Sequence, residues 1–254
     1  LEEAAGRDVV IGFIGHKPKQ INDKGTQLKK SLKDFRYTHY FTAQQKKWIL
    51  YLEGSTDLSV LINFAKKLEH PVLPHLENIF VHYISTNQPN IAKNHFFALK
   101  DAVPELKGIA LFDKIEHEES SEGDLLICKW RKTEIENYIF NTKILLRFAK
   151  GKPLYDLFFP IESGNNEKIM HDVINSIIPA IARDNPYYSE YWDNQKASEQ
   201  LVQIFKLYYQ KKKTYNLMDK SKLYGLIDYF EKNEIDKEII EKFDLIFQIA
   251  KSIK

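Results

Sequence analysis

A buried strand that ends in a carboxylate, with a helix directly after it, is the feature that most constrains the fold of this chain. The apolar run Trp48–Leu52 predicts a buried strand and places Glu53 at its carboxyl end. Gly54 permits a sharp turn, and the Ser-Thr pair at 55–56 is expected to cap a helix with Asp57 in its first turn. Since open α/β sheets bind ligands at the carboxyl ends of their strands, we expect Glu53 and Asp57 to share one site there.

A second apolar strand ends in the same way. The run Gly108–Phe112 predicts another buried strand, and Asp113 follows it directly. Carboxylates delivered to one edge of a sheet offer the hard oxygen ligands that Mg²⁺ prefers. The sequence therefore predicts a magnesium site that includes Glu53, Asp57 and Asp113.

Strands and helices alternate through the first half of the chain, and helical periodicity dominates the second half. We predict strands at 9–14, 47–53, 80–84, 108–113 and 125–130. Between the first four of these strands we predict helices at 24–35, 58–70 and 91–103, and after the last strand helices at 134–149, 166–182, 195–211, 221–232 and 236–251. The β-α-β-α-β order predicts an α/β fold with a parallel sheet flanked by helices, followed by an α-helical C-terminal cap.

Composition limits the class of protein. The 254 residues, 43% of them hydrophobic, suffice for a substantial core. The formal charge of +2 is too balanced to indicate nucleic-acid binding by itself. The single Cys128 excludes an internal disulfide and suits a reducing cytoplasmic location. No apolar run approaches the roughly 20 residues of a membrane span, so no membrane partner is expected.

The segment after the last predicted strand offers two more candidate ligands. Thr133-x-x-Glu136 matches a capping box, with Thr133 as the N-cap of a helix. Glu136 therefore has two interpretations, as a helix cap or as a metal ligand beside the strand-end carboxylates. The eight histidines form no His-x-x-x-His pair, so zinc is not expected. We interpret His16, His82 and His95 as surface or core residues.

Three segments together resemble a known family. Residues 52–57 (Leu-Glu-Gly-Ser-Thr-Asp), 111–113 (Leu-Phe-Asp) and 133–138 (Thr-Glu-Ile-Glu-Asn-Tyr) resemble the Toprim domain of overcoming-lysogenisation-defect (OLD) nucleases, in which an ATPase precedes a Toprim nuclease. The resemblance implies a Toprim-like fold and a division into a tail of a preceding ATPase domain or linker (1–46), a Toprim α/β core (47–131) and a Toprim-completing helix with a helical C-terminal region (132–254).

The resemblance implies a divalent-metal-dependent endonuclease that cleaves phosphodiester bonds in DNA, or in RNA, as the catalytic half of an antiviral defence protein of prokaryotes. Two Mg²⁺ or Mn²⁺ ions would be held by Glu53, Asp57, Asp113, Thr133 and Glu136. Glu53 would also be the general acid or base. A late lysine would stabilise charge in the transition state, and it matches Lys220 best, with Lys222 as the alternative.

The sequence departs from the family at one position. Toprim domains usually contain Asp-x-Asp, but Ile115 stands where the second aspartate is expected. Glu116 is a substitute shifted by one residue, or one metal binds more weakly, or the nuclease is impaired. The last case gives the alternative function: a non-catalytic module that binds nucleic acid or a partner.

Further partners follow from the same resemblance. There is no Gly-x-x-x-x-Gly-Lys-Ser/Thr phosphate loop. ATP is therefore expected only on an N-terminal ATPase domain that precedes this chain, and the family favours homo-oligomers.

Overall fold

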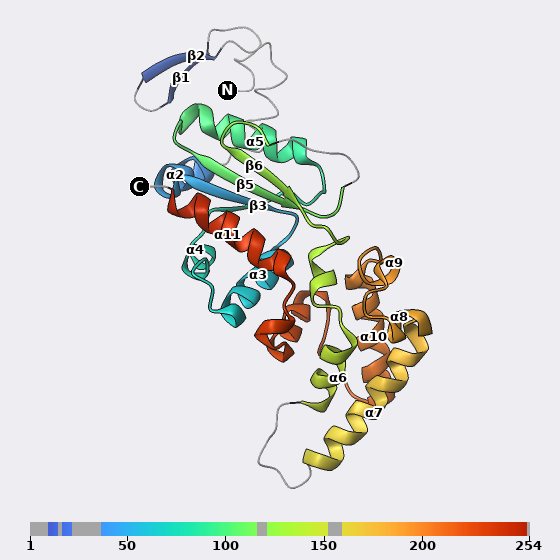
Figure 1. Cartoon of the computed structure of the whole chain (residues 1–254). Helices are drawn as coiled ribbons and strands as arrows, with labels where there is room; N and C mark the ends of the chain where they lie inside the picture. The colour runs from blue at the N-terminus through green and yellow to red at the C-terminus, as the bar shows by residue number, and fades with distance from the viewer. Residues whose placement is uncertain (1–9, 15–16, 22–36, 116–120, 152–158, 253–254) are drawn as a thin grey trace.

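The centre of the protein is a four-stranded sheet with all strands parallel, in the order β4-β3-β5-β6 (Figure 1). The computed structural model describes residues 10–14, 17–21, 37–115, 121–151 and 159–252. The four strands are β3 (Trp48–Leu52), β4 (Val81–Tyr83), β5 (Lys107–Phe112) and β6 (Leu125–Lys129). The parallel sheet flanked by helices that the alternation predicts is confirmed.

The chain reverses its direction across the sheet after β4. It leaves β3 through α3 (Ser55–Leu68) and α4 (Leu73–Glu77) and returns in β4 on one side of β3. It then crosses through α5 (Pro89–Ala102) to β5 on the other side of β3. Such a switch point leaves a crevice at the carboxyl ends of the two strands, here β3 and β5.

Alternate residues of β3 face two different hydrophobic clusters. Leu50 and Leu52 belong to the cluster that includes buried residues of α3 and of α11 (Lys237–Lys251). Ile49 and Tyr51 belong to the cluster that includes α5 and Ala43 of α2 (Tyr37–Lys46). In Figure 1, α5 covers one face of the sheet and α3, α4 and α11 the other. Because both faces are covered, β3 and β5 are continuous apolar runs.

The contact between α5 and the sheet requires a glycine. A Cβ atom added to Gly108 of β5 would lie 2.8 Å from the ring of Phe96 on α5 and 2.9 Å from Leu125 on β6. The missing side chain thus lets α5 approach the strand closely.

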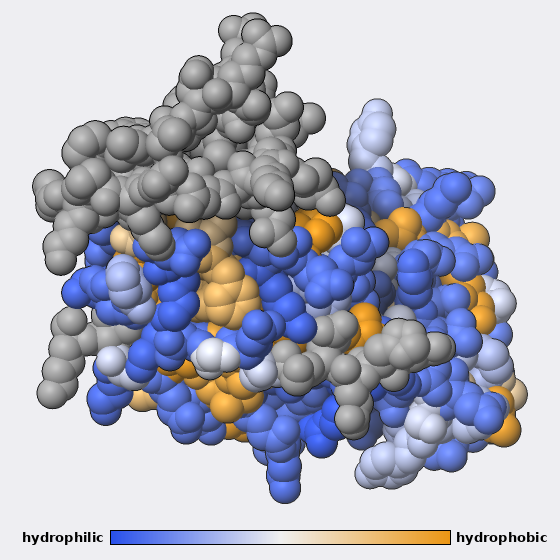
Figure 2. Space-filling view, turned by 90° about the horizontal axis from the view of Figure 1, so that it is seen from above, coloured by the Kyte–Doolittle hydropathy of each residue, from blue (hydrophilic) through white to orange (hydrophobic). Residues whose placement is uncertain are grey.

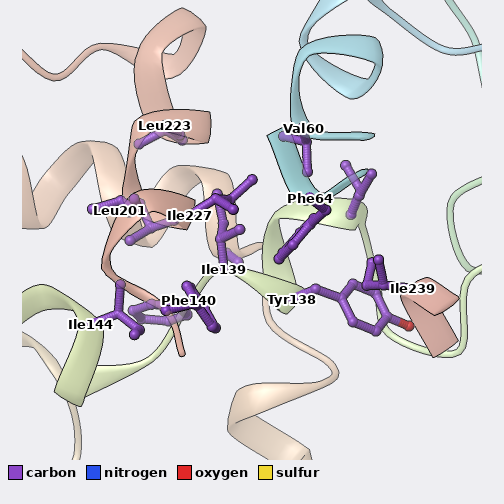
Figure 3. Packing of buried hydrophobic residues seen from close by; sticks show 14 of the residues in the cluster. Val60, Phe64, Tyr138, Ile139, Phe140, Ile144, Leu201, Leu223, Ile227 and Ile239 are labelled. Carbon is purple, nitrogen blue, oxygen red and sulfur yellow. The ribbon is translucent and has the colours of Figure 1, made fainter. Parts of the chain in front are cut away.

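The helical region shares a core with the sheet. Figure 3 shows Phe64 of α3, Ile139 and Ile227 packed together, and all three belong to the larger cluster. The elements of the helical region are η1 (Ile135–Tyr138), α6 (Thr142–Lys150), α7 (Phe159–Ile177), α8 (Ala180–Asp184), α9 (Ser189–Trp192), α10 (Ala197–Lys212), η2 (Lys220–Tyr229) and η3 (Lys232–Glu234).

Two of the predicted helices are divided. The helix expected at 134–149 is the short 3₁₀ helix η1 followed by α6, because Asn141 caps α6 by accepting a hydrogen bond from the Lys143 N–H at 2.8 Å. The helix expected at 166–182 ends as α7 at Ile177, and Pro179 precedes α8. The segment expected to be helical at 221–232 is largely the 3₁₀ helix η2.

The last helix covers the sheet rather than extending the helical region. Phe243 and Ile246 of α11 are fully buried in the cluster that contains Leu111 of β5. Glu238, only 1% exposed, accepts hydrogen bonds from the Arg131 backbone N–H at 3.0 Å and the Arg131 Nε–H at 2.9 Å. These bonds fix the start of α11 to the segment that follows β6.

The first two strands form a separate sheet. β1 (Val10–Ile14) pairs antiparallel with β2 (Lys17–Ile21), so the strand predicted at 9–14 is present but lies outside the parallel sheet. The helix predicted at 24–35 falls outside the described residues. The division at 46 and 131 stays a prediction.

The surface on the α5 side is largely hydrophilic. In Figure 2, hydrophobic residues on this face lie in small groups between hydrophilic ones. Within the described ranges, no helix combines the length and apolar character needed to cross a bilayer.

Candidate metal centre

A cleft of about 430 Å³ lies at the carboxyl edge of the sheet, and we call it the carboxylate cleft. It is lined by Glu53, Gly54, Thr56, Asp57, Ser85, Asp113, Thr133, Glu134, Glu136, Lys196, Ser198, Glu199, Val202 and Lys220. Apart from Lys222, the alternative to Lys220, every predicted site residue that the structure describes is therefore on its wall. Glu116 lies outside the described residues.

The turn between β3 and α3 is organised by Asp57. Its Oδ2 accepts hydrogen bonds from the backbone N–H groups of Glu53 and Gly54, each at 3.1 Å, and its Oδ1 accepts one from the Thr56 hydroxyl at 3.3 Å. The N-cap of α3 is Gly54, so the prediction of a cap at 55–56 was wrong. Asp57, in the first turn, is the side chain that closes the capping box. It thereby fixes the backbone of Glu53 at the cleft.

The loop after β4 is joined to the same turn. The Ser85 N–H donates to the Glu53 carbonyl oxygen at 3.0 Å. Glu53 is thus held on both sides, by Asp57 along the chain and by the neighbouring strand's loop.

The capping box after β6 is shifted by one residue from the predicted one. The N-cap of η1 is Glu134, whose N–H donates to Asn137 Oδ1 at 3.0 Å, so the assignment of Thr133 as N-cap was wrong. The Thr133 hydroxyl instead donates to the Asp193 carbonyl oxygen at 3.0 Å. Glu136 does not close a capping box, and its side chain, 4% exposed, lines the cleft. Of its two interpretations, the capping role is excluded.

Glu134 is a cleft residue that the sequence analysis missed. It is 7% exposed, and its Oε1 accepts a hydrogen bond from the Ser198 N–H at the start of α10, at 2.5 Å. The amide of Asn137 donates to the Trp192 and Gln195 carbonyl oxygens at 2.9 and 2.8 Å. The two side chains therefore attach the helical region to the wall of the cleft. The alternation of acids at 134 and 136 was the available signal.

The carboxylates raise one another's pKa. Burial, followed by the charges of Glu53, Asp57, Glu134 and Glu136, raises the pKa of Asp113 to about 8. Burial and the charge of Glu134 raise the pKa of Glu136 to about 7. Burial also raises the pKa of Asp57, against the opposing effect of its hydrogen bonds.

This charge distribution fits a divalent cation. Acidic side chains from three separate segments converge in one cleft, and all offer hard oxygen atoms. A cation between them would stabilise the ionised forms that burial and repulsion now disfavour.

The structure distinguishes the two candidate lysines. Lys220, at the start of η2, lines the cleft, and its charge opposes the rise in the pKa of Glu136. Lys222 is not among the lining residues, and its Nζ lies 3.9 Å from Asp219 Oδ2. A second lysine of the cleft, Lys196, lies 3.6 Å from Glu199. Lys220 is thus the better placed of the two candidates.

Ile115 does not reach the cleft. Its side chain is half-buried, and its carbonyl oxygen accepts a hydrogen bond from Lys129 Nζ at 3.3 Å. Among the described residues, the end of β5 therefore supplies Asp113 alone, while Glu134 supplies a carboxylate from another segment.

Comparison with known proteins does not assign this chain to a family. No family model, curated protein or solved structure matches it. The functional argument therefore depends on the cleft itself.

Proposed function

We propose that this protein is a divalent-metal-dependent nuclease of the Toprim type that hydrolyses phosphodiester bonds in nucleic acid, DNA being the favoured substrate. The observation behind the proposal is the convergence of Glu53, Asp57, Asp113 and Glu136 with Lys220 in one cleft. Carboxylates alone would favour any cation, but the added lysine also suits an anionic substrate.

The acidic residues divide into two roles. Asp113 and Glu136 have raised pKa values and lie among like charges, so they would hold Mg²⁺ or Mn²⁺, together with Asp57 and the Thr133 hydroxyl. When bound, such ions activate water and stabilise the charge of a phosphodiester during displacement. Glu53 would contribute a carboxylate to the ions and accept or donate a proton at its carboxylate oxygen.

Lys220 would act on the phosphate. It is an exposed cation that lines the cleft and is supplied by the helical region. A fixed positive charge there would orient the phosphate and offset the charge that develops on the departing oxygen.

The segment that leads to Lys220 suits a nucleic acid chain. Between the end of α10 and η2, Tyr215 is 91% exposed and Leu217 is 63% exposed. Exposed aromatic rings stack on bases, and the lysines in the last turn of α10, Lys211 and Lys212, add positive charge beside them.

The test is cleavage of supercoiled plasmid and of labelled single- and double-stranded oligonucleotides with Mg²⁺ or Mn²⁺. We expect cleavage that a chelator abolishes, and a fall of about 10³-fold or more in Glu53→Gln, because it removes a group that acts in the transition state. Glu105→Gln, a surface acid paired with Lys47 at 3.7 Å, is the matched control and should cleave like wild type. Equal cleavage by wild type and Glu53→Gln would remove Glu53 from the mechanism.

The absence of a second aspartate favours one alternative, an assembly module without catalysis. Ile115 occupies the expected position, and its side chain does not line the cleft. Manganese binding that is lost in Asp113→Asn, without cleavage of any nucleic acid, would support this alternative over the nuclease.

A further inference from the structure

Three histidines from separate elements meet on the α5 side of the sheet, and we call them the histidine cluster. They are His39 of α2, His82 of β4 and His95 of α5, and one nitrogen from each lies within 4.8 Å of the others. His39 Nδ1 lies 3.1 Å from His95 Nε2. The rings of His82 and His95 stack, with centroids 3.9 Å apart, and His39 stands edge-on to both.

Tyr51 fixes the orientation of the most buried of these rings. His95 is 6% exposed, and its Nδ1 lies 2.9 Å from the hydroxyl of Tyr51, which is fully buried on β3. When Nδ1 donates to that hydroxyl, the neutral ring presents the lone pair of Nε2 toward His39. A metal-ligating histidine is oriented in the same way by a partner on its other nitrogen.

Burial also favours the neutral, ligating form of His95. Burial, together with the neighbouring His82 and His39, lowers the pKa of His95 to about 3. The ring is therefore neutral near pH 7, and neutral imidazole is the ligating form.

We propose that His39, His82 and His95 form a second metal site, for Zn²⁺ or a similar transition-metal ion, separate from the carboxylate cleft. Imidazole nitrogens favour such ions, whereas carboxylate oxygens favour Mg²⁺ and Mn²⁺. With three protein ligands, the fourth position of a tetrahedral ion is left to solvent, and the half-buried His39 and His82 leave one side of the cluster accessible to it.

Binding requires a limited movement of one ring. Tetrahedral nitrogens at about 2.0–2.1 Å from Zn²⁺ are roughly 3.4 Å apart, so the three nitrogens, which lie within 4.8 Å of one another, must approach by up to about 1.4 Å. Stacked rings direct their lone pairs along parallel planes, so His82 must turn about its Cβ–Cγ bond. His82 is on the edge strand β4 and is half-buried, which gives its ring the room to turn.

An ion in the cluster would add a link between the three elements that carry these histidines. It would tie α2 to β4 and α5, and so to the face of the sheet opposite α3 and α11. We expect bound Zn²⁺ to raise the thermal stability of the chain.

The test is a Zn²⁺ titration of the whole chain against a chromophoric chelator, made in the Asp113→Asn background to weaken binding in the carboxylate cleft. We expect one equivalent of tightly bound Zn²⁺, and visible d–d absorption when Co²⁺ replaces it. His39→Gln and His82→Gln should each weaken Zn²⁺ binding by about 100-fold or more, since each removes a ligand. His171→Gln, an exposed histidine of α7 beside Asn175, is the matched control and should bind like the parent.

A variant that keeps all three ligands makes the test specific. Tyr51→Phe retains the ring in the core and removes only the hydroxyl beside His95, so it should weaken Zn²⁺ binding by about 10–100-fold. Circular dichroism of each variant checks that it is folded.

Two results would overturn the proposal. One is the absence of tight Zn²⁺ binding in the parent chain. The other is unchanged binding in the His39→Gln/His82→Gln double variant. Neither result bears on plasmid cleavage, which tests the carboxylate cleft independently.

Discussion

The carboxylate cleft and the histidine cluster are both built around β3, and burial changes their protonation in opposite directions. Among the carboxylates, loss of water and like charges raise the pKa of Asp113 to about 8. Among the histidines, the same two causes lower the pKa of His95 to about 3. Each group is driven toward its neutral form. The difference lies in the donor atoms, oxygen in one place and nitrogen in the other, which select different cations.

Of the effects that compare the two regions, the largest is expected from the charge of Lys220 in the carboxylate cleft. Lys220→Ala should reduce nucleic-acid cleavage by about 10²-fold or more, because a fixed charge near the reacting phosphate is lost. Lys222→Ala, two residues away and paired with Asp219, should change the rate less than about twofold, as expected for an exposed ion pair. Zn²⁺ binding should be the same in both. Similar losses of activity in the two variants would contradict the placement of Lys220.

The next prediction concerns Asn137, which supports the wall of the carboxylate cleft and is not part of the histidine cluster. Asn137, 2% exposed, accepts a hydrogen bond from the Glu134 N–H at the start of η1 and donates two more to the Trp192 and Gln195 carbonyl oxygens. Asn137→Ala should lower the free energy of unfolding by about 2–4 kcal/mol, since each buried bond contributes roughly 1 kcal/mol and unpaired carbonyl groups remain. Urea denaturation measures the loss. Mn²⁺ affinity should fall with it, whereas a parallel fall in Zn²⁺ affinity would show that the two regions are not independent.

Gly108→Ala perturbs the region of the histidine cluster instead of the cleft. The added methyl group would press on Phe96 of α5, the helix that contains His95, at a cost of about 1–3 kcal/mol. Thermal unfolding should report the destabilisation, and Zn²⁺ binding should weaken more than Mn²⁺ binding. Equal effects on both metals would mean that the strain spreads across the sheet.

The smallest effect is a difference in pH dependence for the metal-free chain. The pKa of Asp113 is raised from 3.8 to about 8, so its contribution to stability is lost as the pH rises through this range. The pKa of His95 is lowered from 6.5 to about 3, so its contribution is lost as the pH falls through that range. One titrating group changes stability by at most about 1.4 kcal/mol per pH unit.

Urea midpoints measured in the presence of a chelator check both signs. Asp113→Asn should flatten the loss of stability toward alkaline pH, and His95→Gln should flatten the loss toward acidic pH. Asp113→Asn should also raise the melting temperature of the metal-free chain at pH 8 by about 2–4 °C, equivalent to roughly 1 kcal/mol. A lower melting temperature would mean that the Asp113 carboxylate stabilises the folded chain rather than destabilising it.

The sheet and most of the cleft could be predicted because residues that follow parallel strands in the sequence lie at the same edge of the sheet. Glu53 and Asp113 follow apolar runs, and the carboxyl ends of parallel strands meet at one edge, so their convergence needs no knowledge of side-chain packing. Glu136 was a candidate because it follows the last predicted strand, and Lys220 was placed through a resemblance. Both line the cleft, but that placement does not establish the family.

Other residues depend on packing that no local pattern encodes. Glu134 replaced Thr133 as the N-cap because Thr133 is bound to Asp193, far along the chain. The histidines stand at unrelated spacings, and they meet only because α2 and α5 lie on the same face of the sheet. Sequence spacing therefore predicted the convergence of carboxylates at strand ends and missed the histidines, which meet only through the packing of α2 and α5 beside β4.

The position of α11 has a consequence for synthesis. The strands of the sheet are translated before α11, but the sheet face that includes Leu111 is covered by Phe243 and Ile246 of that helix. A nascent chain that has not yet formed α11 therefore leaves the apolar surface beside Leu111 uncovered, the kind of surface that chaperones bind and that drives aggregation. Packing of α11 is what shields it.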